Sequence, residues 1–549
     1  MDYAPEIKKF FKGEVRSDEK TLAAASHDAS IFEVKPALVV APRDVYDVKN
    51  LVAFAARKKR EGGKISLTVR SAGTDMTGGP LTESIVVDFL PHFNHVKAVG
   101  AGYAVTEPGV YYRDFERETL KRGLWMPSYP ASRDLCTVGG MVANNAGGEK
   151  TLTYGKTENY VRQVKTVLSD GGEYVFQPLT IPELEKARGR RDFFGEVCRQ
   201  MFELVVKNYD LLKKAKPAVS KNSAGYFLWN VYDKEKGLFD LTKLIVGSQG
   251  TLGIITEVKF RLVAPKPFSS LLIMFLPSLR PLAEITNHVL QFQPESFESF
   301  DDHTLKVALK LFPAIVKKLN GSLLKLAIQF LPEFFMALTG GVPKLILIAE
   351  FTADTQEAAA AKAAAAQESL LPFGLKTKIA RDEAEAKKYW TFRRESFNLL
   401  RQHMRNLRTA PFIDDFVVRP EFLPEFLPKL NAILSKYPIT YTVAGHVGDG
   451  NFHIIPLMNL SKPESLAIIK ELTDKVYRLV LNFKGTISGE HNDGLIRSSF
   501  LPLMYSPEII ELFEETKRIF DPLNIFNPGK KVGAIRNYEW EHINRTQSA

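Results

Sequence analysis

Cysteine is nearly absent from the sequence: Cys136 and Cys198 are the only two among 549 residues. Two cysteines cannot build a disulfide framework or supply the four thiolates of an iron–sulfur cluster. Their scarcity fits a reducing compartment, and residues 1–16 lack the apolar core of a signal peptide. We therefore expect a cytoplasmic protein without an iron–sulfur cluster of its own.

The excess of positively over negatively charged residues is also small. The 73 Lys and Arg residues exceed the 63 Asp and Glu residues by ten, which gives a formal net charge of +10. This balance favours anionic substrates or a membrane surface without requiring either. The basic residues are scattered, and we find no zinc finger, aromatic RNA-binding signature or long basic run, so we expect no nucleic-acid partner.

The chain is too long for one hydrophobic core, and its pattern restarts once. Before Pro265 it alternates as strands and helices of an α+β region, with strands expected at 37–41, 64–70, 84–89 and 104–106 and helices at 45–57 and 112–122. After Pro267 two strand–helix–strand units follow, at 269–275, 279–292 and 295–300, then at 344–351, 355–371 and 375–380. We expect an N-terminal extension (1–32), a first domain (33–265), a second domain (266–500), a C-terminal segment returning to the first domain (501–535) and a tail (536–549).

Between the two units lies a stretch, Leu305–Leu338, that is rich in Leu, Phe, Ile and Ala but carries five lysines. The lysines leave no apolar run long enough to span a bilayer. Two interpretations of this insert (304–341) stay open: basic amphipathic helices on the inner face of the plasma membrane, or helices packed on the second domain.

A Rossmann dinucleotide fingerprint is missing, since Gly100-Ala-Gly102 has Val105 where the third glycine belongs. Three other glycine clusters are present instead, within 69–80, 137–148 and 247–254. Backbone amides at such turns can hold a pyrophosphate, although any one cluster taken alone could be an ordinary turn.

Together with Pro108-Gly109, Tyr154-Gly155 and the Asp170-Gly171-Gly172 turn, these clusters resemble the PCMH-type FAD-binding domain of the vanillyl-alcohol oxidase family. Downstream, the motifs at 445–453, 488–494 and 520–530 resemble the D-lactate dehydrogenase and glycolate oxidase subgroup. The resemblance runs from about Ala29 to Lys531. It implies an α+β fold, with a two-lobed FAD-binding domain and a cap, or substrate, domain built on a mixed sheet covered by helices.

The resemblance also implies which residues contact FAD. The residues carried over are Arg70, Ser71, Ala72, Gly73, Thr74, Asp75, Pro108, Gly109, Ser132, Thr137, Gly139, Gly140, Ala143, Asn144, Asn145, Gly147, Tyr154, Gly250, Gly253, Ile254 and Asn527. Some members of the family attach FAD covalently through a histidine in the first glycine cluster, where this chain has Thr74 and Asp75. We therefore expect non-covalent FAD.

Two histidines, His446 and His453, flank an Asp-Gly turn and could converge with Glu490 on a divalent metal. Two imidazoles and a carboxylate suit Zn²⁺, Mn²⁺ or Fe²⁺ and leave positions open for a chelating hydroxy acid. By the resemblance, these three residues are the metal ligands, and the adjacent His491 is the base that takes the substrate's hydroxyl proton before hydride passes to flavin N5. Asn451 joins the catalytic group. The alternative is two core histidines and a capping glutamate.

A hydroxy acid also needs a cation for its carboxylate, which a planar arginine can grip through two oxygens. The segment Trp390–Glu395 resembles the family's Trp-x-x-Arg stretch, which makes Arg393 the candidate and Arg394 the next, although at least one of them is expected on a solvated helix face. Ile413 stands where hydroxyglutarate-type relatives have a substrate-binding lysine, so a second substrate carboxylate is less supported. Asn492-Asp493 replaces smaller residues and adds a negative charge near the metal.

These features predict an FAD-dependent dehydrogenase that oxidises a small anionic 2-hydroxy acid, with D-lactate the simplest candidate and glycolate or other D-2-hydroxy acids next. The electron acceptor could be a quinone, a cytochrome, an electron-transfer flavoprotein, a separate iron–sulfur subunit or oxygen. Two other functions stay open: a non-catalytic flavin-binding subunit of a glycolate-oxidase-like complex, and a sugar or lactone oxidase. The first should lack the metal-and-base residues, and the second the paired histidine motif.

Overall fold

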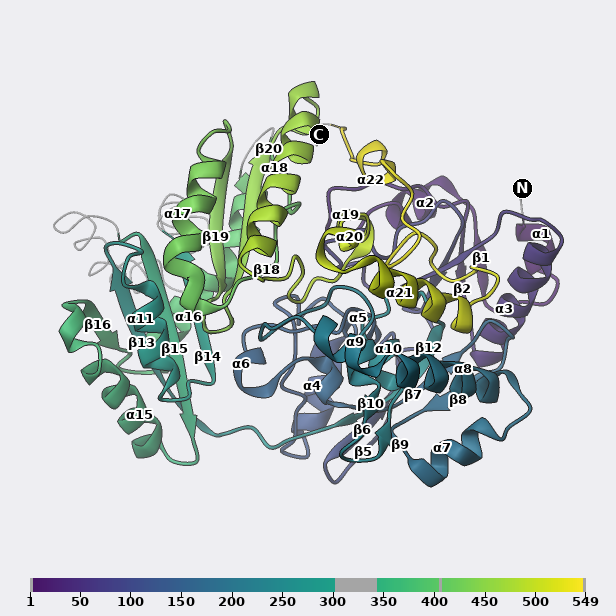
Figure 1. Ribbon diagram of the computed structural model, residues 1–549, viewed down its shortest axis with the longest axis horizontal. Coiled ribbons are helices and arrows are strands. Elements are labelled where there is room, and N and C mark those ends of the chain that lie inside the picture. Colours follow the sequence, from purple (N-terminus) through teal and green to yellow (C-terminus); the bar gives the residue numbers. More distant parts are fainter. Residues whose placement is uncertain (1–2, 302–342, 404–406, 547–549) are drawn as a thin grey trace.

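The computed structural model describes residues 3–301, 343–403 and 407–546 (Figure 1). The stretch Leu305–Leu338, with its two alternative interpretations, therefore lies outside the described residues. Within the described part of the chain, every helix is too short or too polar to cross a bilayer.

The first sheet is small and is built from the N-terminal part of the chain. Its strands are β1 (Glu14–Arg16), β2 (Leu38–Ala41), β3 (Leu67–Arg70) and β4 (Ile85–Asp88), in the order β1-β2-β4-β3. The pairs β2–β4 and β3–β4 are parallel, as expected for strands that helix α3 (Val45–Arg60) connects. Asp44 caps α3 by accepting hydrogen bonds from the N–H groups of Tyr46 and Asp47, so the helix starts where the sequence predicts.

A second, antiparallel sheet follows. Its strands are β5 (Val96–Gly100), β6 (Tyr103–Thr106), β7 (Val161–Val167), β8 (Glu173–Phe176) and β12 (Ile254–Arg261), in the order β5-β6-β12-β7-β8. Short strands β9 (Leu179–Thr180), β10 (Tyr232–Asp233) and β11 (Leu238–Phe239) form a separate three-stranded sheet. The helices around them are α4 (Tyr112–Leu120), α5 (Val138–Asn144), α6 (Thr151–Tyr154), α7 (Ile181–Arg188), α8 (Phe193–Lys207), α9 (Tyr209–Ala215) and α10 (Thr242–Ile245).

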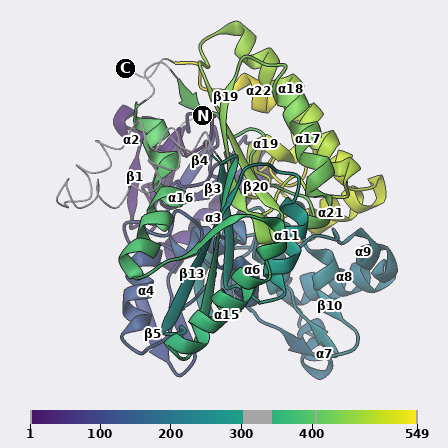
Figure 2. The same cartoon turned by 90° about the vertical axis from the view of Figure 1, so that its left-hand side faces the viewer.

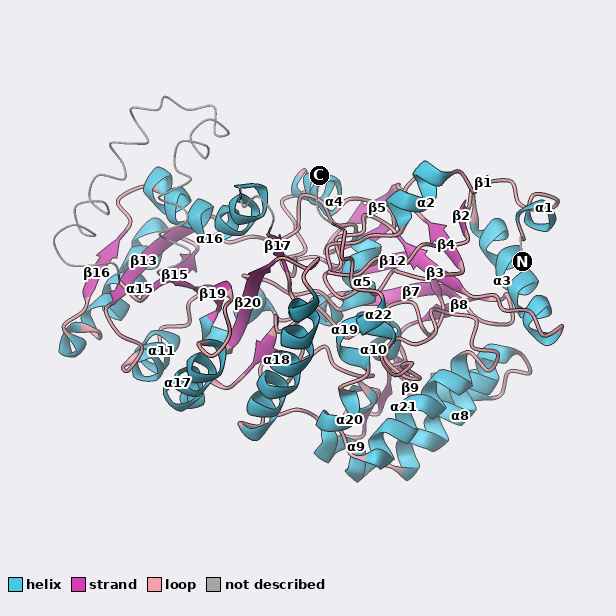
Figure 3. Cartoon of the chain, turned by 90° about the horizontal axis from the view of Figure 1, so that it is seen from above, coloured by secondary structure: helices cyan, strands magenta, loops and turns pink. Residues whose placement is uncertain are grey.

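The third sheet lies at the other end of the elongated molecule (Figure 3). It consists of β13 (Phe268–Leu276), β14 (Ser296–Asp301), β15 (Leu345–Ala353), β16 (Lys376–Ile379), β17 (Arg408–Thr409), β18 (Phe416–Val417), β19 (Thr440–His446) and β20 (Asn451–Met458). We expected a mixed sheet here, but all its described pairings are antiparallel. The reason is that β15 inserts between β13 and β14, so the two strands of the first strand–helix–strand unit never pair with each other.

Helices cover this third sheet (Figure 2). They are α11 (Leu282–Leu290), α15 (Gln356–Glu368), α16 (Glu383–His403), α17 (Leu423–Leu434) and α18 (Pro463–Asn482). Buried side chains of α11, α15, α17 and α18 share one core with sheet residues such as Leu272, Met274 and Leu347. Burial on one face fixes these helices against the sheet.

The chain then returns to its first half through α19 (Gly494–Ser498), α20 (Leu501–Met504), α21 (Pro507–Phe520) and α22 (Tyr538–Glu541), coloured yellow in Figure 1. Phe513 and Phe520 belong to the core of the second sheet. Phe526 bridges to Leu67 of β3, and Ile543 bridges to Phe32. The C-terminal segment thus ties the third-sheet region back to the N-terminal sheets.

An ion cluster links the first half of the chain to the third sheet. Lys150, just before α6, pairs with Glu350 on β15 and, at 2.6 Å, with Glu295 just before β14. We expect Lys150→Met to destabilise the protein by about 3–5 kcal/mol, because the buried Glu295 and the partly buried Glu350 would lose their counter-ion. Chemical denaturation followed by tryptophan fluorescence measures this. The control Lys35→Met removes an exposed pair with Glu19 and should cost less than about 1 kcal/mol; equal costs for the two variants would contradict the prediction.

Candidate functional site

A pocket opens between the first two sheets where the glycine clusters meet. It encloses about 840 Å³ of space, part of it open to solvent. Thirteen of the predicted FAD contacts line it: Arg70, Ser71, Gly73, Thr74, Asp75, Pro108, Thr137, Gly139, Gly140, Ala143, Asn144, Gly250 and Gly253. Six further residues line it that were not among the predicted contacts: Val69, Gly79, Pro80, Phe89, Gln249 and Ile255. Gln249 was adjacent to a predicted residue and lies within the third glycine cluster.

Backbone groups in this pocket suit a phosphate-bearing ligand. Among the described residues, the N–H groups of residues 71–75 donate no backbone hydrogen bond, so they are free to serve an anion. Gly139 packs so closely that an added Cβ would lie 2.6 Å from the oxygen of Pro108. Gly250 has φ +69°, a left-handed conformation that disfavours other residues. The residues present therefore fit an extended dinucleotide such as FAD.

The other eight predicted contacts do not line this pocket. Tyr154 donates a hydrogen bond to Glu295 in the ion cluster, and Asn527 braces the pocket wall by donating to the carbonyls of Gly79 and Gln249. Gly147 lies against the carboxylate of Glu490, where an added Cβ would come within 3.0 Å. The remaining five, with their places, are Ala72 in the 71–75 loop, Gly109 against Phe89, Ser132 in a turn, Asn145 at the end of α5 and Ile254 at the start of β12.

His446 and His453 come from one tight hairpin. His446 ends β19 and pairs with Asn451, while His453 on β20 pairs with Ala444, so both histidines project from the same face. The turn depends on Gly450, whose φ is +66° and whose added Cβ would collide with the Val418 carbonyl. The two rings lie 5.2 Å apart and nearly perpendicular.

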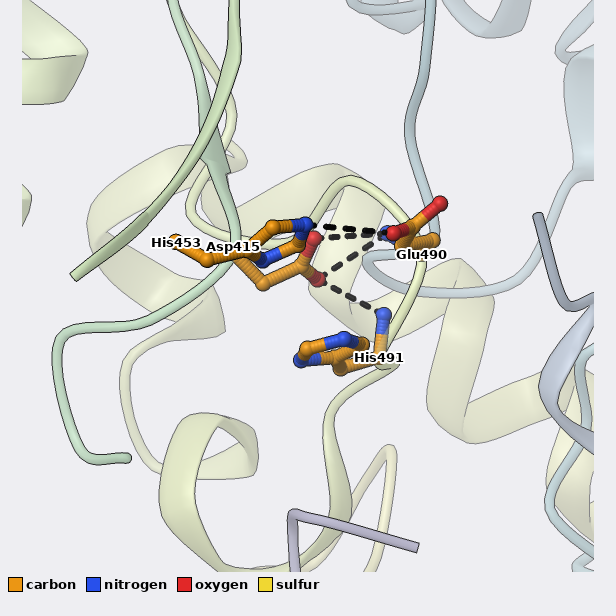
Figure 4. A group of neighbouring side chains, drawn as sticks. All are labelled: Asp415, His453, Glu490 and His491. Atoms are coloured by element: carbon orange, nitrogen blue, oxygen red, sulfur yellow. Dashed lines mark hydrogen bonds and ion pairs between the residues drawn. The ribbon is translucent and has the colours of Figure 1, made fainter. Parts of the chain in front are cut away.

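Glu490 lies on the loop after α18 and meets both rings. Its Oε1 is 3.0 Å from Nε2 of His446 and 3.3 Å from Nε2 of His453. Asp415 holds this loop by accepting hydrogen bonds from the N–H groups of Glu490 and His491 at 2.9 and 2.7 Å (Figure 4). The ligand-type atoms of Asp415, His453, Glu490 and His491 all lie within 4.8 Å of one another. This group contains His453 and Glu490 of the three predicted metal ligands, and the third, His446, joins them through its contact with Oε1 of Glu490.

The other ring nitrogens have carboxylate partners, which the sequence analysis missed. Glu298 lies 2.6 Å from Nδ1 of His446, and Asp414 lies 2.9 Å from Nδ1 of His453. Carboxylates in this position are typical of histidines that bind metal through Nε2. The donor set and its surroundings therefore fit a divalent metal. Asp414 stands beside Ile413 in a stretch already singled out, so an acidic pair amid apolar residues was the available signal.

The charge of the cluster follows from its burial and its partners. Burial alone would raise the pKa of Glu490, but Lys221, 3.5 Å from its Oε2, and His446 hold that pKa well below its usual range. Lys221 is fully buried and also pairs with Asp449 at 3.2 Å. Burial alone would lower the pKa of His453, but Asp414 and Glu490 outweigh it and raise the pKa to about 10.

We therefore expect metal affinity to rise with pH. At neutral pH the raised pKa keeps a proton on His453, which a metal must displace from the ring. Each unit of pH below about 10 should cost up to about tenfold in affinity for one displaced proton. Titration of the metal-free protein with Zn²⁺ or Mn²⁺ at pH 6, 7 and 8 measures this. Equal affinities at the three pH values would contradict it.

The predicted base and arginine also reach the cluster. His491 stacks on His453 with ring centroids 5.0 Å apart, and its Nδ1 lies 2.8 Å from Asp414. Arg393 on α16 pairs with Glu298 at 3.0 Å, and Glu298 in turn contacts His446. Arg394 instead pairs with Glu149 at the rim, with 45% of its side chain exposed. Of the two arginines, Arg393 is the one at the cluster.

Asn451 has an unusual buried amide. Its Nδ2 donates to Asp415 and to the carbonyl of Phe416, while its buried Oδ1 has no hydrogen-bond partner among the described residues. Asp493, which we expected to add negative charge near the metal, is fully buried and pairs with the equally buried Lys531 at 3.0 Å. Its charge is therefore offset. Ile413 is fully buried as well.

The loop 490–494 connects the cluster with the FAD pocket. Asn492 donates hydrogen bonds to the carbonyls of Asn144 and Gly247, and the N–H of Gly494 donates to Gln249. Asn144 and Gln249 line the pocket. The loop that carries Glu490 and His491 therefore packs against residues that line the pocket.

Two protein families match the chain, one in its first part and one in its second. The family described as "FAD binding domain" matches residues 36–176, and "FAD linked oxidases, C-terminal domain" matches residues 266–531. The chain belongs to the FAD-linked oxidases. The pocket and the histidine cluster are therefore sites of an FAD-linked oxidase.

The curated relatives of this FAD-linked oxidase have names that refer to hydroxy acids. D-2-hydroxyglutarate dehydrogenase of Pseudomonas putida is 27% identical over 536 residues, covering 95% of this chain and 50% of the relative. D-lactate dehydrogenase of Archaeoglobus fulgidus is 26% identical, covering 94% of this chain and 95% of the relative. Glycolate oxidase subunit GlcD of Bacillus subtilis is 24% identical, at 92% and 91%. The chain spans about half the length of several relatives it matches.

Solved structures share the fold of the FAD-linked oxidase. 4-Ethylphenol oxidase from Gulosibacter chungangensis superposes with a TM-score of 0.68 at 16% identity, covering 96% of each chain. p-Cresol methylhydroxylase gives a TM-score of 0.66 at 15% identity, covering 94% of this chain and 93% of the other. At these identities the likeness bears on the fold alone. The predicted α+β architecture with a PCMH-type FAD-binding domain is confirmed.

Proposed function

We propose that the protein is an FAD-dependent dehydrogenase that oxidises a small 2-hydroxy acid to the 2-oxo acid. One observation carries this proposal. Two imidazole Nε2 atoms converge on Glu490 beside a third imidazole, and the loop that carries Glu490 hydrogen-bonds to residues that line the FAD pocket. The names of the relatives support the same chemistry.

Each residue of the cluster has a role in this proposal. His446, His453 and Glu490 hold a divalent cation, for which Zn²⁺, Mn²⁺ and Fe²⁺ are candidates. When bound, the cation supplies a Lewis acid for the substrate's hydroxyl and carboxylate, and FAD supplies the hydride acceptor. His491 takes the hydroxyl proton on its Nε2, because its Nδ1 faces Asp414. Arg393 orients the carboxylate, and the unpaired Oδ1 of Asn451 accepts a substrate hydrogen bond.

The substrate we favour has one carboxylate, with D-lactate first and glycolate or another D-2-hydroxy acid next. Ile413 offers no charge for a distal carboxylate at the position where hydroxyglutarate-type relatives have a lysine, and it is fully buried. The electrons then pass to a quinone, a cytochrome, an electron-transfer flavoprotein or an iron–sulfur subunit. In this proposal the protein is cytoplasmic, with the insert 304–341 as the candidate for peripheral contact with the plasma membrane.

Anaerobic mixing with D- and L-lactate, glycolate, and D- and L-2-hydroxyglutarate tests the proposal. We expect loss of flavin absorbance near 450 nm, fastest with D-lactate and dependent on added divalent metal. If no acid of the panel reduces the flavin with metal present, the substrate class is wrong. In that case a sugar or lactone panel tests the wider oxidase alternative, and reduction by no compound at all supports a non-catalytic subunit.

We also expect the FAD to be non-covalent. The pocket presents Thr74 and Asp75, and neither a hydroxyl nor a carboxylate is an attachment residue of the expected histidine type. Precipitation of the purified protein with acid should therefore release all the flavin into the supernatant, where chromatography identifies it as FAD. Yellow colour retained in the pellet would contradict this expectation.

A further inference from the structure

One carboxylate stands between two imidazoles of the cluster. Oδ1 of Asp414 lies 2.9 Å from Nδ1 of His453, and Oδ2 lies 2.8 Å from Nδ1 of His491. The carboxylate is 1% exposed, and the two rings stack within 16° of parallel. The contact with His453 is a hydrogen bond, whereas Oδ2 of Asp414 and Nδ1 of His491 are buried atoms in ion-pair contact that make no hydrogen bond among the described residues.

This contact decides which ring nitrogen is available for chemistry. An ionised carboxylate has lone pairs and no proton to donate, so an Nδ1 lone pair this close to it would be repelled, and each Nδ1 facing Asp414 carries the proton. A neutral imidazole then keeps its lone pair on Nε2, the nitrogen that binds a metal or accepts a proton. In His453 that nitrogen faces Glu490 at 3.3 Å.

The partner of His446 provides a contrast. Glu298 lies 2.6 Å from Nδ1 of His446 and is as buried as Asp414, at 1% exposure. Its other contact is with Arg393. Glu298 thus supports one metal ligand and the substrate arginine, whereas the two oxygens of Asp414 face a metal ligand and the base.

We propose that Asp414 is a positioning residue shared by the metal ligand His453 and the base His491, and that it fixes the Nδ1–H tautomer of both rings. The inference rests on the proposed function and deepens it. Metal binding at His453 and proton transfer at His491 would then depend on a single side chain.

The substitution Asp414→Asn separates the two roles. The amide side chain would have one acceptor and one donor in place of two acceptors, so only one ring could keep its Nδ1–H tautomer. Bound metal at Nε2 of His453 requires Nδ1–H there, which turns the amide oxygen toward His453 and the NH₂ group toward His491. The Nε2 of His491 would then carry the proton and could not act as a base.

The test compares Asp414→Asn with Glu298→Gln. Both substitutions should weaken Zn²⁺ or Mn²⁺ binding about 10–100-fold, because each removes a carboxylate that faces the Nδ1 of a histidine proposed to bind the metal. At saturating metal and hydroxy acid, we expect Glu298→Gln to lose less of the wild-type limiting rate of flavin reduction than Asp414→Asn loses, because His491 keeps its carboxylate neighbour. Its half-saturation concentration should rise, because Arg393 loses a charged partner. Asp414→Asn should stay about 10²-fold or more below the wild-type limiting rate. A metal-loaded Asp414→Asn protein that reaches the wild-type limiting rate would overturn the proposal.

A second measurement needs no Asp414 variant. Nitrogen-15 histidine spectra of the metal-loaded wild-type protein, at a pH where the ring is neutral, distinguish Nδ1–H from Nε2–H, and His491→Ala assigns the signal. We expect His491 to carry its proton on Nδ1; a proton on Nε2 would overturn the proposal even if Asp414→Asn failed to fold. If no hydroxy acid reduces the wild-type flavin, the proposed function fails, while the tautomer still decides the role of Asp414.

Discussion

Replacing His491 by alanine is expected to slow flavin reduction by a 2-hydroxy acid about 10²–10⁴-fold, the range that a positioned general base contributes. The ring stands beside Glu490 in sequence, stacks on His453 at 5.0 Å and holds its Nδ1 2.8 Å from Asp414. No other imidazole of the cluster can replace it, because the Nε2 atoms of His446 and His453 both face Glu490. Anaerobic stopped-flow absorbance at saturating substrate measures the limiting rate.

His542 provides the matched control. Its side chain is 21% exposed, against 22% for His491, and it likewise faces a carboxylate, Glu83 at 3.2 Å. His542 lies in the C-terminal segment away from the cluster, so His542→Ala should reduce its flavin at the wild-type rate. FAD content and metal affinity should be unchanged in both variants. A His491→Ala protein that keeps the wild-type rate would favour a non-catalytic flavin-binding subunit.

The sequence allowed most secondary elements to be predicted, because buried strands and amphipathic helices have periodic apolar residues. Expected strand 269–275 is β13 (Phe268–Leu276), and expected helix 355–371 is α15 (Gln356–Glu368). The sheet pairing was predicted less well. Which strands become neighbours depends on contacts far apart in sequence, so the insertion of β15 between β13 and β14 left no periodic signal.

The candidate site, like the fold, could be predicted only in part. His446, His453, Glu490 and His491 could be named because they lie in two compact motifs, and the structure brings them together. Glu298, 148 positions before His446 in the chain, could not be linked to it by any local pattern. Tyr154 was assigned to FAD by resemblance, yet its hydroxyl faces Glu295. Residues that support a site from other elements are chosen by tertiary packing, which a motif does not record.

Changing Glu490 to glutamine is the second change for which we expect a large effect. The Glu490 carboxylate is the shared partner of two Nε2 atoms, and Lys221 and His446 hold its pKa well below the usual range. Glutamine keeps the shape and removes the charge. Metal affinity should fall by more than the roughly 10–100-fold typical of outer partners. The rate at fixed metal should fall about 10³-fold, since a Lewis acid contributes several kcal/mol.

Glu295→Gln separates this loss from a general effect of neutralising a buried glutamate. Glu295 is as buried as Glu490, at 5% against 7%, and pairs with Lys150 in the ion cluster away from the histidines. We expect Glu295→Gln to keep metal affinity and Glu490→Gln to lose it. The two variants should lose similar amounts of stability, because each leaves its buried lysine one carboxylate partner, Glu350 for Lys150 and Asp449 for Lys221. Metal titration and chemical denaturation of both variants decide it. If Glu490→Gln bound Zn²⁺ and Mn²⁺ as tightly as the wild type, Glu490 would not be a metal ligand, and the cluster would be a hydrogen-bonded core of two histidines and a glutamate.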